Sequence, residues 1–113
     1  MKIIDSPVRL RDLALMAETG FGDLVKAVVD VERGIMAVDG ELHSDEEALL
    51  LENGSEQRHL WGINIYPDLA DPERVEFDSM INIRPSQDNR SRGVDDLEIR
   101  ARILRIVDAL VTS

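Results

Sequence analysis

The residues best suited to chemistry in this chain lie between Met80 and Asp96, where the sequence reads MINIRPSQDNRSRGVDD. Three arginines in this stretch stand among short polar side chains that can donate hydrogen bonds. Guanidinium groups bind carboxylate or phosphate through paired hydrogen bonds, and Gly93 lets the backbone adopt conformations that other residues resist. The stretch therefore predicts a site for a small phosphate or carboxylate ligand. Its candidate ligand-binding residues are Arg84, Arg90, Arg92, Asn82, Ser86, Gln87 and Asn89.

The same stretch also has a purely structural interpretation. Asp95 and Asp96 occupy the start of a predicted helix, which would otherwise attract an anion, and they can pair with Arg90 and Arg92. In an acidic chain, arginines also serve in ordinary surface salt bridges. The stretch has no dinucleotide or P-loop fingerprint, so the residue types alone name no ligand and no reaction.

A second group with possible chemistry is His43 with the acidic residues Asp45, Glu46 and Glu47. Imidazole and carboxylate groups can hold a divalent metal ion or act as a general acid and base. However, Ser44 and Glu47 have the spacing of a capping box, in which each side chain accepts a hydrogen bond from the backbone of the other residue. We favour the structural interpretation and predict no metal site.

The composition describes a small soluble domain. The chain has 113 residues, of which 43% are hydrophobic and 32% charged, and this predicts one domain over residues 1–113 with its own core. No apolar run approaches the roughly 20 residues that span a bilayer, and the N-terminus lacks the pattern of a secretory signal. We therefore expect a cytoplasmic protein without a membrane partner. The absence of cysteine excludes disulfides and thiolate catalysis.

The charge balance disfavours nucleic acid as a partner. The formal net charge is −10, from 23 acidic and 13 basic residues, and a phosphate backbone repels such a surface. Only Lys2 and Lys26 are lysines. The remaining basic residues are arginines, which suit planar contacts with a carboxylate or phosphate.

Three helices are predicted. The first covers Pro7 to Thr19, with Ser6 as the cap, and the last runs from Leu97 to the C-terminal end after a cap at Asp95 or Asp96. A short helix through Ala48 to Leu51 is favoured over a strand, although the apolar run itself fits both.

Five segments have strand patterns: Lys2 to Asp5, Leu24 to Glu32, Ile35 to Val38, Leu60 to Tyr66 and Val75 to Arg84. The last two are expected to pair antiparallel. Their apolar sides would then face the core, and their reverse side would collect Asn64, Tyr66, Asp78, Asn82 and Arg84.

The predicted fold class is α+β. We expect two layers, with a mixed or largely antiparallel sheet of four to five strands and with the N- and C-terminal helices packed on one face. Asn64 and Tyr66 on the reverse side complete the candidate ligand-binding set.

Three long segments resemble a family of short bacterial and archaeal proteins that is classified only as a domain of unknown function. The segments are VKAVVDVERGIMAVDGELHSDEEALLLENGS, LWGINIYP and FDSMINIRPSQDNRSRGV. The resemblance covers nearly the whole chain, and it implies no reaction, cofactor or catalytic residue.

Two functional hypotheses follow from the sequence. The first is a binding module, or an enzyme, that acts on a small anionic ligand held by the arginine stretch. The second is a non-catalytic interaction protein that uses the same sheet face and loop in a homodimer or with another partner. A ligand site requires a pocket on which these side chains converge, whereas an interface requires an extended surface with Met80 and Tyr66 near its centre.

Overall fold

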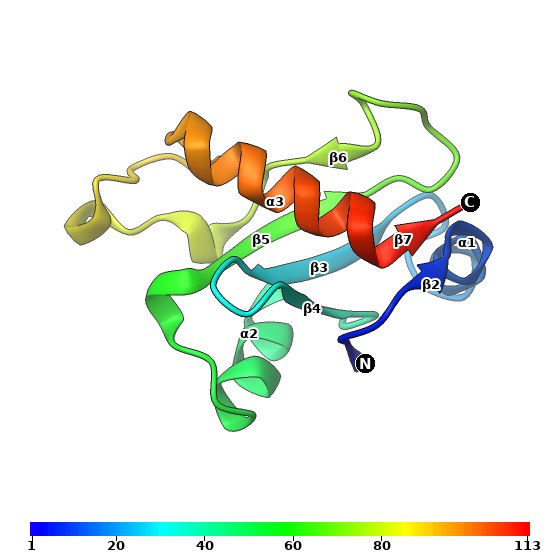
Figure 1. Cartoon of the computed structure of the whole chain (residues 1–113), viewed down its shortest axis with the longest axis horizontal. Coiled ribbons are helices and arrows are strands. Elements are labelled where there is room, and N and C mark those ends of the chain that lie inside the picture. Colours follow the sequence, from blue (N-terminus) through cyan, green and yellow to red (C-terminus); the bar gives the residue numbers. More distant parts are fainter.

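The computed structural model describes residues 1–113 and is built on a five-stranded antiparallel sheet (Figure 1). The strands are β1 (Lys2–Ile4), β3 (Val25–Asp30), β4 (Ile35–Val38), β5 (Leu60–Ile65) and β6 (Val75–Glu76), in the spatial order β1-β4-β3-β5-β6. The long central strands, β3 and β5, pair from Val25 opposite Ile65 to Asp30 opposite Leu60. The predicted α+β class with a largely antiparallel sheet is confirmed.

Helices α1 (Leu10–Thr19) and α3 (Leu97–Leu110) cover one face of this sheet. Alternate residues of β5 point toward them, which buries Trp61, Ile63 and Ile65 in the main core. Leu13 of α1 and Ile103 of α3 are fully buried in the same core. The predicted packing of the first and last helices on one face is therefore confirmed.

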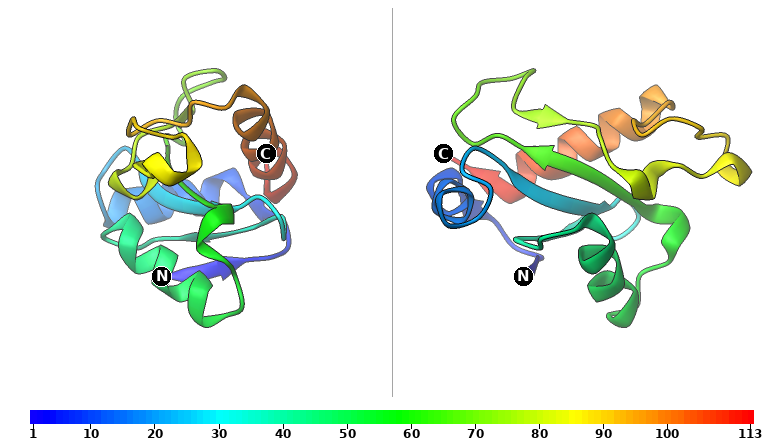
Figure 2. Two further views of the ribbon diagram at one scale, coloured as in Figure 1. Left: turned by 90° about the vertical axis from the view of Figure 1, so that its left-hand side faces the viewer. Right: turned by 180° about the vertical axis from the view of Figure 1, so that it is seen from behind.

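The middle helix, α2 (His43–Glu52), packs on the opposite face of the sheet (Figure 2). Its residue Leu50 joins Val28, Ala37 and Leu60 in a second, smaller core. The run Leu49 to Leu51 is helical, as favoured from the sequence. None of the helices is long and apolar enough to span a membrane.

The first helix begins three residues later than predicted. Val8 and Arg9 form the short strand β2 (Val8–Arg9), which runs parallel to β7 (Val111–Thr112) at the other end of the chain. This pairing holds the two residues in an extended conformation. Ser6 therefore does not cap the helix, and the Asp12 carboxylate accepts a hydrogen bond from the backbone N–H of Arg9 instead.

The predicted capping box at Ser44 and Glu47 is wrong. Leu42 occupies the N-cap position of α2 and supplies no side-chain hydrogen bond, so Ser44 already lies inside the helix. The carboxylate that turns back to the preceding loop belongs to Glu46, whose Oε2 accepts a hydrogen bond of 2.9 Å from the N–H of Gly40. Of the two caps considered for α3, Asp96 is the actual one, because its Oδ1 accepts a hydrogen bond from the N–H of Glu98.

The predicted strand from Val75 to Arg84 stops after Glu76. Short helical turns follow at η2 (Met80–Asn82) and η3 (Pro85–Gln87); the third such turn, η1 (Gln57–His59), precedes β5. In place of a strand, the Asn82 side chain pairs with β5, accepting a hydrogen bond of 2.8 Å from Gly62 N and donating one of 3.0 Å to Gly62 O. A side-chain amide has the same donor and acceptor as a peptide group, so Asn82 replaces the strand that the alternation predicts.

Candidate functional site

The predicted ligand-binding residues divide between two places in the fold, and Arg84 lies at one of them. Its guanidinium stacks on the Trp61 ring, with the central carbon 4.2 Å from the ring centroid. It donates a hydrogen bond to the carbonyl of Gln57 and another, of 2.6 Å, to the carbonyl of Leu60. Burial lowers the pKa of Arg84, and the nearby Glu47 carboxylate opposes this effect. The guanidinium thus joins the start of β5 to the residues before it.

The two loop asparagines of the predicted set, Asn82 and Asn89, are buried and hold the loop together. Asn82 also donates to the carbonyl of Arg92 at 2.9 Å. Asn89 donates to the carbonyls of Asn82 and Gly93 at 2.7 and 2.9 Å, and its Oδ1 accepts from Asp95 N at 2.8 Å. All these partners belong to the backbone of the same protein, so these amide groups define the path of the loop.

The remaining loop residues are exposed. Gln87 donates a hydrogen bond of 3.1 Å to the carbonyl of Arg58. The side chains of Ser86 and Arg90 are exposed and make no hydrogen bond or ion pair within the chain. A ligand role for these residues stays a prediction that no contact within the chain supports, and none of them lines the cavity described below.

The second place gathers Arg92, Asn64 and Tyr66. Arg92 Nε lies 2.6 Å from Asp78 Oδ1 in an ion pair. Asn64 Nδ2 and the Tyr66 hydroxyl both donate to Oε1 of Glu76, at 2.8 and 3.1 Å. More than nine-tenths of Asn64 is buried, yet its Oδ1 has no hydrogen-bond partner. A buried acceptor without a donor is uncommon in proteins and marks this position as one that a bound group can complete.

His43, at the start of α2, lies next to these residues. Its Nε2 is 2.8 Å from the carbonyl oxygen of Ile63. A carbonyl only accepts hydrogen bonds, so Nε2 carries the proton and Nδ1 of the neutral ring is an acceptor. Burial lowers the pKa of His43; Lys26 and Arg92 lower it further, while Ile63 and Asp78 oppose them. Because the ordinary pKa of histidine, 6.5, already lies below 7, this lowering leaves the imidazole mostly neutral at pH 7.

His43, Asn64 and Arg92 line a cavity of about 250 Å³ between the start of α2 and the segment that follows β6, whereas Tyr66 lies outside it. We call it the polar cavity. Lys26 enters it from β3, where it lies directly opposite Asn64 in the sheet register. The cavity is lined by Lys26, Leu42, His43, Ser44, Asn64, Asp78, Met80, Ile81 and Arg92.

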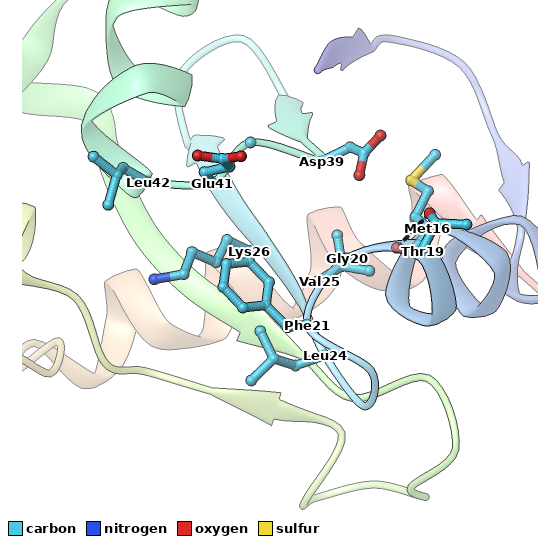
Figure 3. Close-up of a pocket in the computed structure, with 11 residues that line it drawn as sticks. Met16, Thr19, Gly20, Phe21, Leu24, Val25, Lys26, Asp39, Glu41 and Leu42 are labelled. Carbon is cyan, nitrogen blue, oxygen red and sulfur yellow. Dashed lines mark hydrogen bonds between the residues drawn. The ribbon is translucent and has the colours of Figure 1, made fainter.

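A wider cavity of about 610 Å³ adjoins the polar cavity, and Lys26 and Leu42 line both. Figure 3 shows Lys26 lying beside the Phe21 ring, with Asp39 and Glu41 on the opposite wall. The Lys26 amine is 5.2 Å from the centroid of that ring. Lys26 thus stands at the boundary between the two cavities.

His43 and its acidic neighbours do not meet at one point. Asp45 is exposed, Glu46 bonds Gly40, and Glu47 lies near Arg84. No group of three or more histidine or acidic side chains is placed to hold a metal ion.

The sequence prediction placed Asp78 on the same side of the sheet as Asn64 but included neither Lys26 nor Asp78 among the candidate site residues. Lys26 is one of two lysines in an acidic chain, which was the only available signal. Lys26 lies opposite Asn64 because β3 and β5 pair, although the two residues are 38 positions apart in the sequence. An alternating pattern predicts which face of a sheet a residue is on, but not which strand lies beside it.

Searches of curated proteins and of solved structures gave no match to this chain. Residues 2–110 match the family described as "Protein of unknown function (DUF5674)". The match includes every residue of the polar cavity and both residues that join it to the wider one. The chain belongs to this family of proteins of unknown function.

Proposed function

We propose that the protein binds a small anionic molecule in the polar cavity. The observation that carries the proposal is the convergence of Lys26 and Arg92 on a cavity that also contains a buried, unpartnered acceptor, Asn64 Oδ1. The chain carries a net charge of −10. Two basic side chains at one concave site therefore oppose the overall negative charge of the chain.

Arg92 retains donors for a ligand. Its Nε bonds Asp78 and its Nη1 contacts the sulfur of Met80 at 3.4 Å, whereas Nη2 makes no hydrogen bond within the chain. The first N–H groups of α2 have no partner inside the helix, and Ser44, in this first turn, lines the cavity. Amide groups at a helix start favour negative charge.

The unpartnered acceptor Asn64 Oδ1 restricts which anions suit the cavity. Asn64 Oδ1 is a buried acceptor without a donor, and a fully ionised group without a hydroxyl cannot supply that donor. A phosphate group that retains a proton, or a hydroxy-carboxylate, offers negative charge and an O–H group together. The site therefore suits phosphate or a hydroxy acid better than it suits sulfate.

The decisive experiment compares inorganic phosphate with sulfate at pH 6.5, where phosphate keeps at least one proton. We expect phosphate to shift the amide NMR signals of Ser44 and Asn64 in a saturable manner, and sulfate to bind about tenfold more weakly because it leaves the buried acceptor Asn64 Oδ1 unpaired. Arg92→Ala should weaken phosphate binding by about tenfold or more, since charge-assisted hydrogen bonds contribute about 1.5–3 kcal/mol.

Arg90→Ala is the matched control, because Arg90 is an exposed arginine two residues away that has no partner in the chain. It should bind phosphate as the wild type does. Equal losses in the two variants would mean that the loop attracts anions only through its general charge. An absence of saturable shifts at the cavity would exclude the proposed site.

The alternative hypothesis of an interface on this sheet face meets an obstacle. Helix α2 already occupies part of the face, since Leu50 packs against Val28 and Leu60. Met80 is 65% exposed, but Tyr66 donates its hydroxyl to Glu76 and lines a different groove. A homodimer through this face stays a prediction that no contact of the structure supports.

A further inference from the structure

The largest cavity of the protein lies away from the polar cavity, between α3 and the segment that connects β5 to β6. Its volume is about 1010 Å³, and Figure 1 shows α3 running beside β6 and this connection. We call it the α3 groove. Its apolar lining comes from both walls and consists of Leu69, Pro72, Val75, Phe77, Leu97, Ala101 and Leu104.

Three leucines of the α3 groove are open to solvent. Leu97 is 75% exposed, Leu69 44% and Leu104 39%. Leu97, Ala101 and Leu104 follow one another at helical spacing, so they form one stripe along α3. Apolar side chains that follow one face of a helix and meet apolar side chains of an opposite wall form a groove suited to an apolar helix face.

Four carboxylates border the same groove: Asp71, Glu73, Glu76 and Asp108. None of them is in an ion pair within the chain. The one basic residue of the groove, Arg100, is held against its wall, with the guanidinium carbon 4.4 Å from the centroid of the Phe77 ring. An occupant therefore meets an apolar floor with a negative border.

We infer that the α3 groove binds an amphipathic helix of a partner protein that presents apolar residues flanked by lysine or arginine. The border favours basic side chains and repels both a second copy of this acidic chain and an anionic membrane surface. The groove extends along α3 from Leu97 to Asp108, which corresponds to about 16 Å at 1.5 Å per residue and matches roughly three turns of a partner helix. This is the helix-in-groove mode of recognition.

The test uses a fluorescent synthetic peptide of leucine and lysine, about 14 residues long and with leucines at helical spacing. A peptide with the same leucines but glutamate in place of lysine is the charge control. Anisotropy titrations should show saturable binding of the lysine peptide and no binding of the glutamate peptide. Amide NMR shifts caused by the lysine peptide should map to α3 and to residues 66–77.

Matched variants separate binding in the groove from general attraction to an acidic protein. Leu97→Gln should weaken binding by about tenfold or more, because a buried leucine contributes about 1.5–3 kcal/mol, whereas Leu15→Gln on α1 should have little effect. Both leucines are mostly exposed in the free protein, so neither change should prevent folding. Glu73→Lys at the groove should weaken binding far more than Glu18→Lys on α1, although both change the net charge equally.

Equal effects of Glu73→Lys and Glu18→Lys would overturn the inference, as would shifts that map to another face. A concentration-dependent dimer that Leu97→Gln abolishes would also overturn it, with a second copy of the chain as the occupant. Anion binding in the polar cavity does not depend on any of these results, since the two sites share no lining residue.

Discussion

The stability of this protein should fall steeply as the pH rises from 5 to 9 because of one buried carboxyl group, Glu46. The side chain is fully buried, and only one of its oxygens has a hydrogen-bond partner, the N–H of Gly40. The other oxygen, Oε1, is buried without a partner. An ionised carboxylate in these surroundings would lose its hydration without adequate compensation.

Burial raises the pKa of Glu46 from 4.5 to about 9. The hydrogen bond from Gly40 and the positive charges of Lys26 and the N-terminal amine oppose this shift, whereas the carboxylate of Asp39 adds to it. The folded chain thus holds a proton that the unfolded chain releases near pH 4.5. Between these two pKa values the folded state binds one more proton than the unfolded state, so the free energy of unfolding decreases as the pH rises.

The size of the effect follows from the shift. Each pH unit between the two pKa values removes about 1.4 kcal/mol, which amounts to at most about 5 kcal/mol between pH 5 and 9. This is comparable with the whole stability of many domains, about 5–15 kcal/mol. Glu46→Gln keeps the shape and an acceptor for Gly40 but cannot ionise. The free energy of unfolding of this variant, relative to that of the wild type, should increase by about 4 kcal/mol from pH 5 to pH 8.

Urea denaturation at pH 5, 6, 7, 8 and 9 measures this difference, because the midpoint and slope of each transition give the free energy of unfolding. Glu52→Gln is the control, since Glu52 is an exposed residue of the same helix. Its difference from the wild type should not change with pH. A constant difference between Glu46→Gln and the wild type would show that Glu46 is already ionised in the folded chain, and it would refute the reasoning.

Two further predictions concern the contact between β5 and the segment that replaces the expected strand, and urea denaturation tests both. Asn82→Ala should cost about 2–4 kcal/mol, because it leaves both backbone groups of Gly62 buried without partners; a cost below about 1 kcal/mol would mean that water reaches them. Gly62→Ala should cost about 1–3 kcal/mol through overpacking, since a Cβ at this position would lie 2.5 Å from both Cβ and Oγ of Ser79. The added change Ser79→Gly should restore most of that loss, and a failure to do so would place the strain elsewhere.

The sheet was largely predictable because its strands follow simple alternation. Val25, Ala27 and Val29 face the main core as their spacing indicates, and the strand from Ile35 to Val38 has the predicted bounds. The same rule failed for Val75 to Arg84, where apolar residues also alternate except at Ser79. There the buried amides of Asn82 and Asn89 form hydrogen bonds that override the local preference, and such long-range partners leave no periodic signal in the sequence.

The candidate site was only partly predictable for a related reason. The arginines between residues 84 and 92 have the same chemical type, and only the fold decides which of them keep free donors. Arg84 lies close to carbonyl groups of residues 57 and 60, which engage its guanidinium within the chain. Arg92 has a free Nη2 and lies at the polar cavity, together with a histidine that the sequence places far away.

The position of α2 explains both the cavity and the buried carboxyl group. His43 and Glu46 are three residues apart, so they lie on the same side of the helix, where the sheet buries both. Glu46 binds the N–H of Gly40 and its Cγ fills the space in which a side chain at that position would lie, because a Cβ on Gly40 would be 2.7 Å from this atom. Glu46 thereby fixes the turn before α2, although its burial in the protonated form lowers the free energy of unfolding at neutral pH. That turn leads directly into His43, so the residue whose burial makes the stability sensitive to pH also helps to hold the imidazole at the polar cavity.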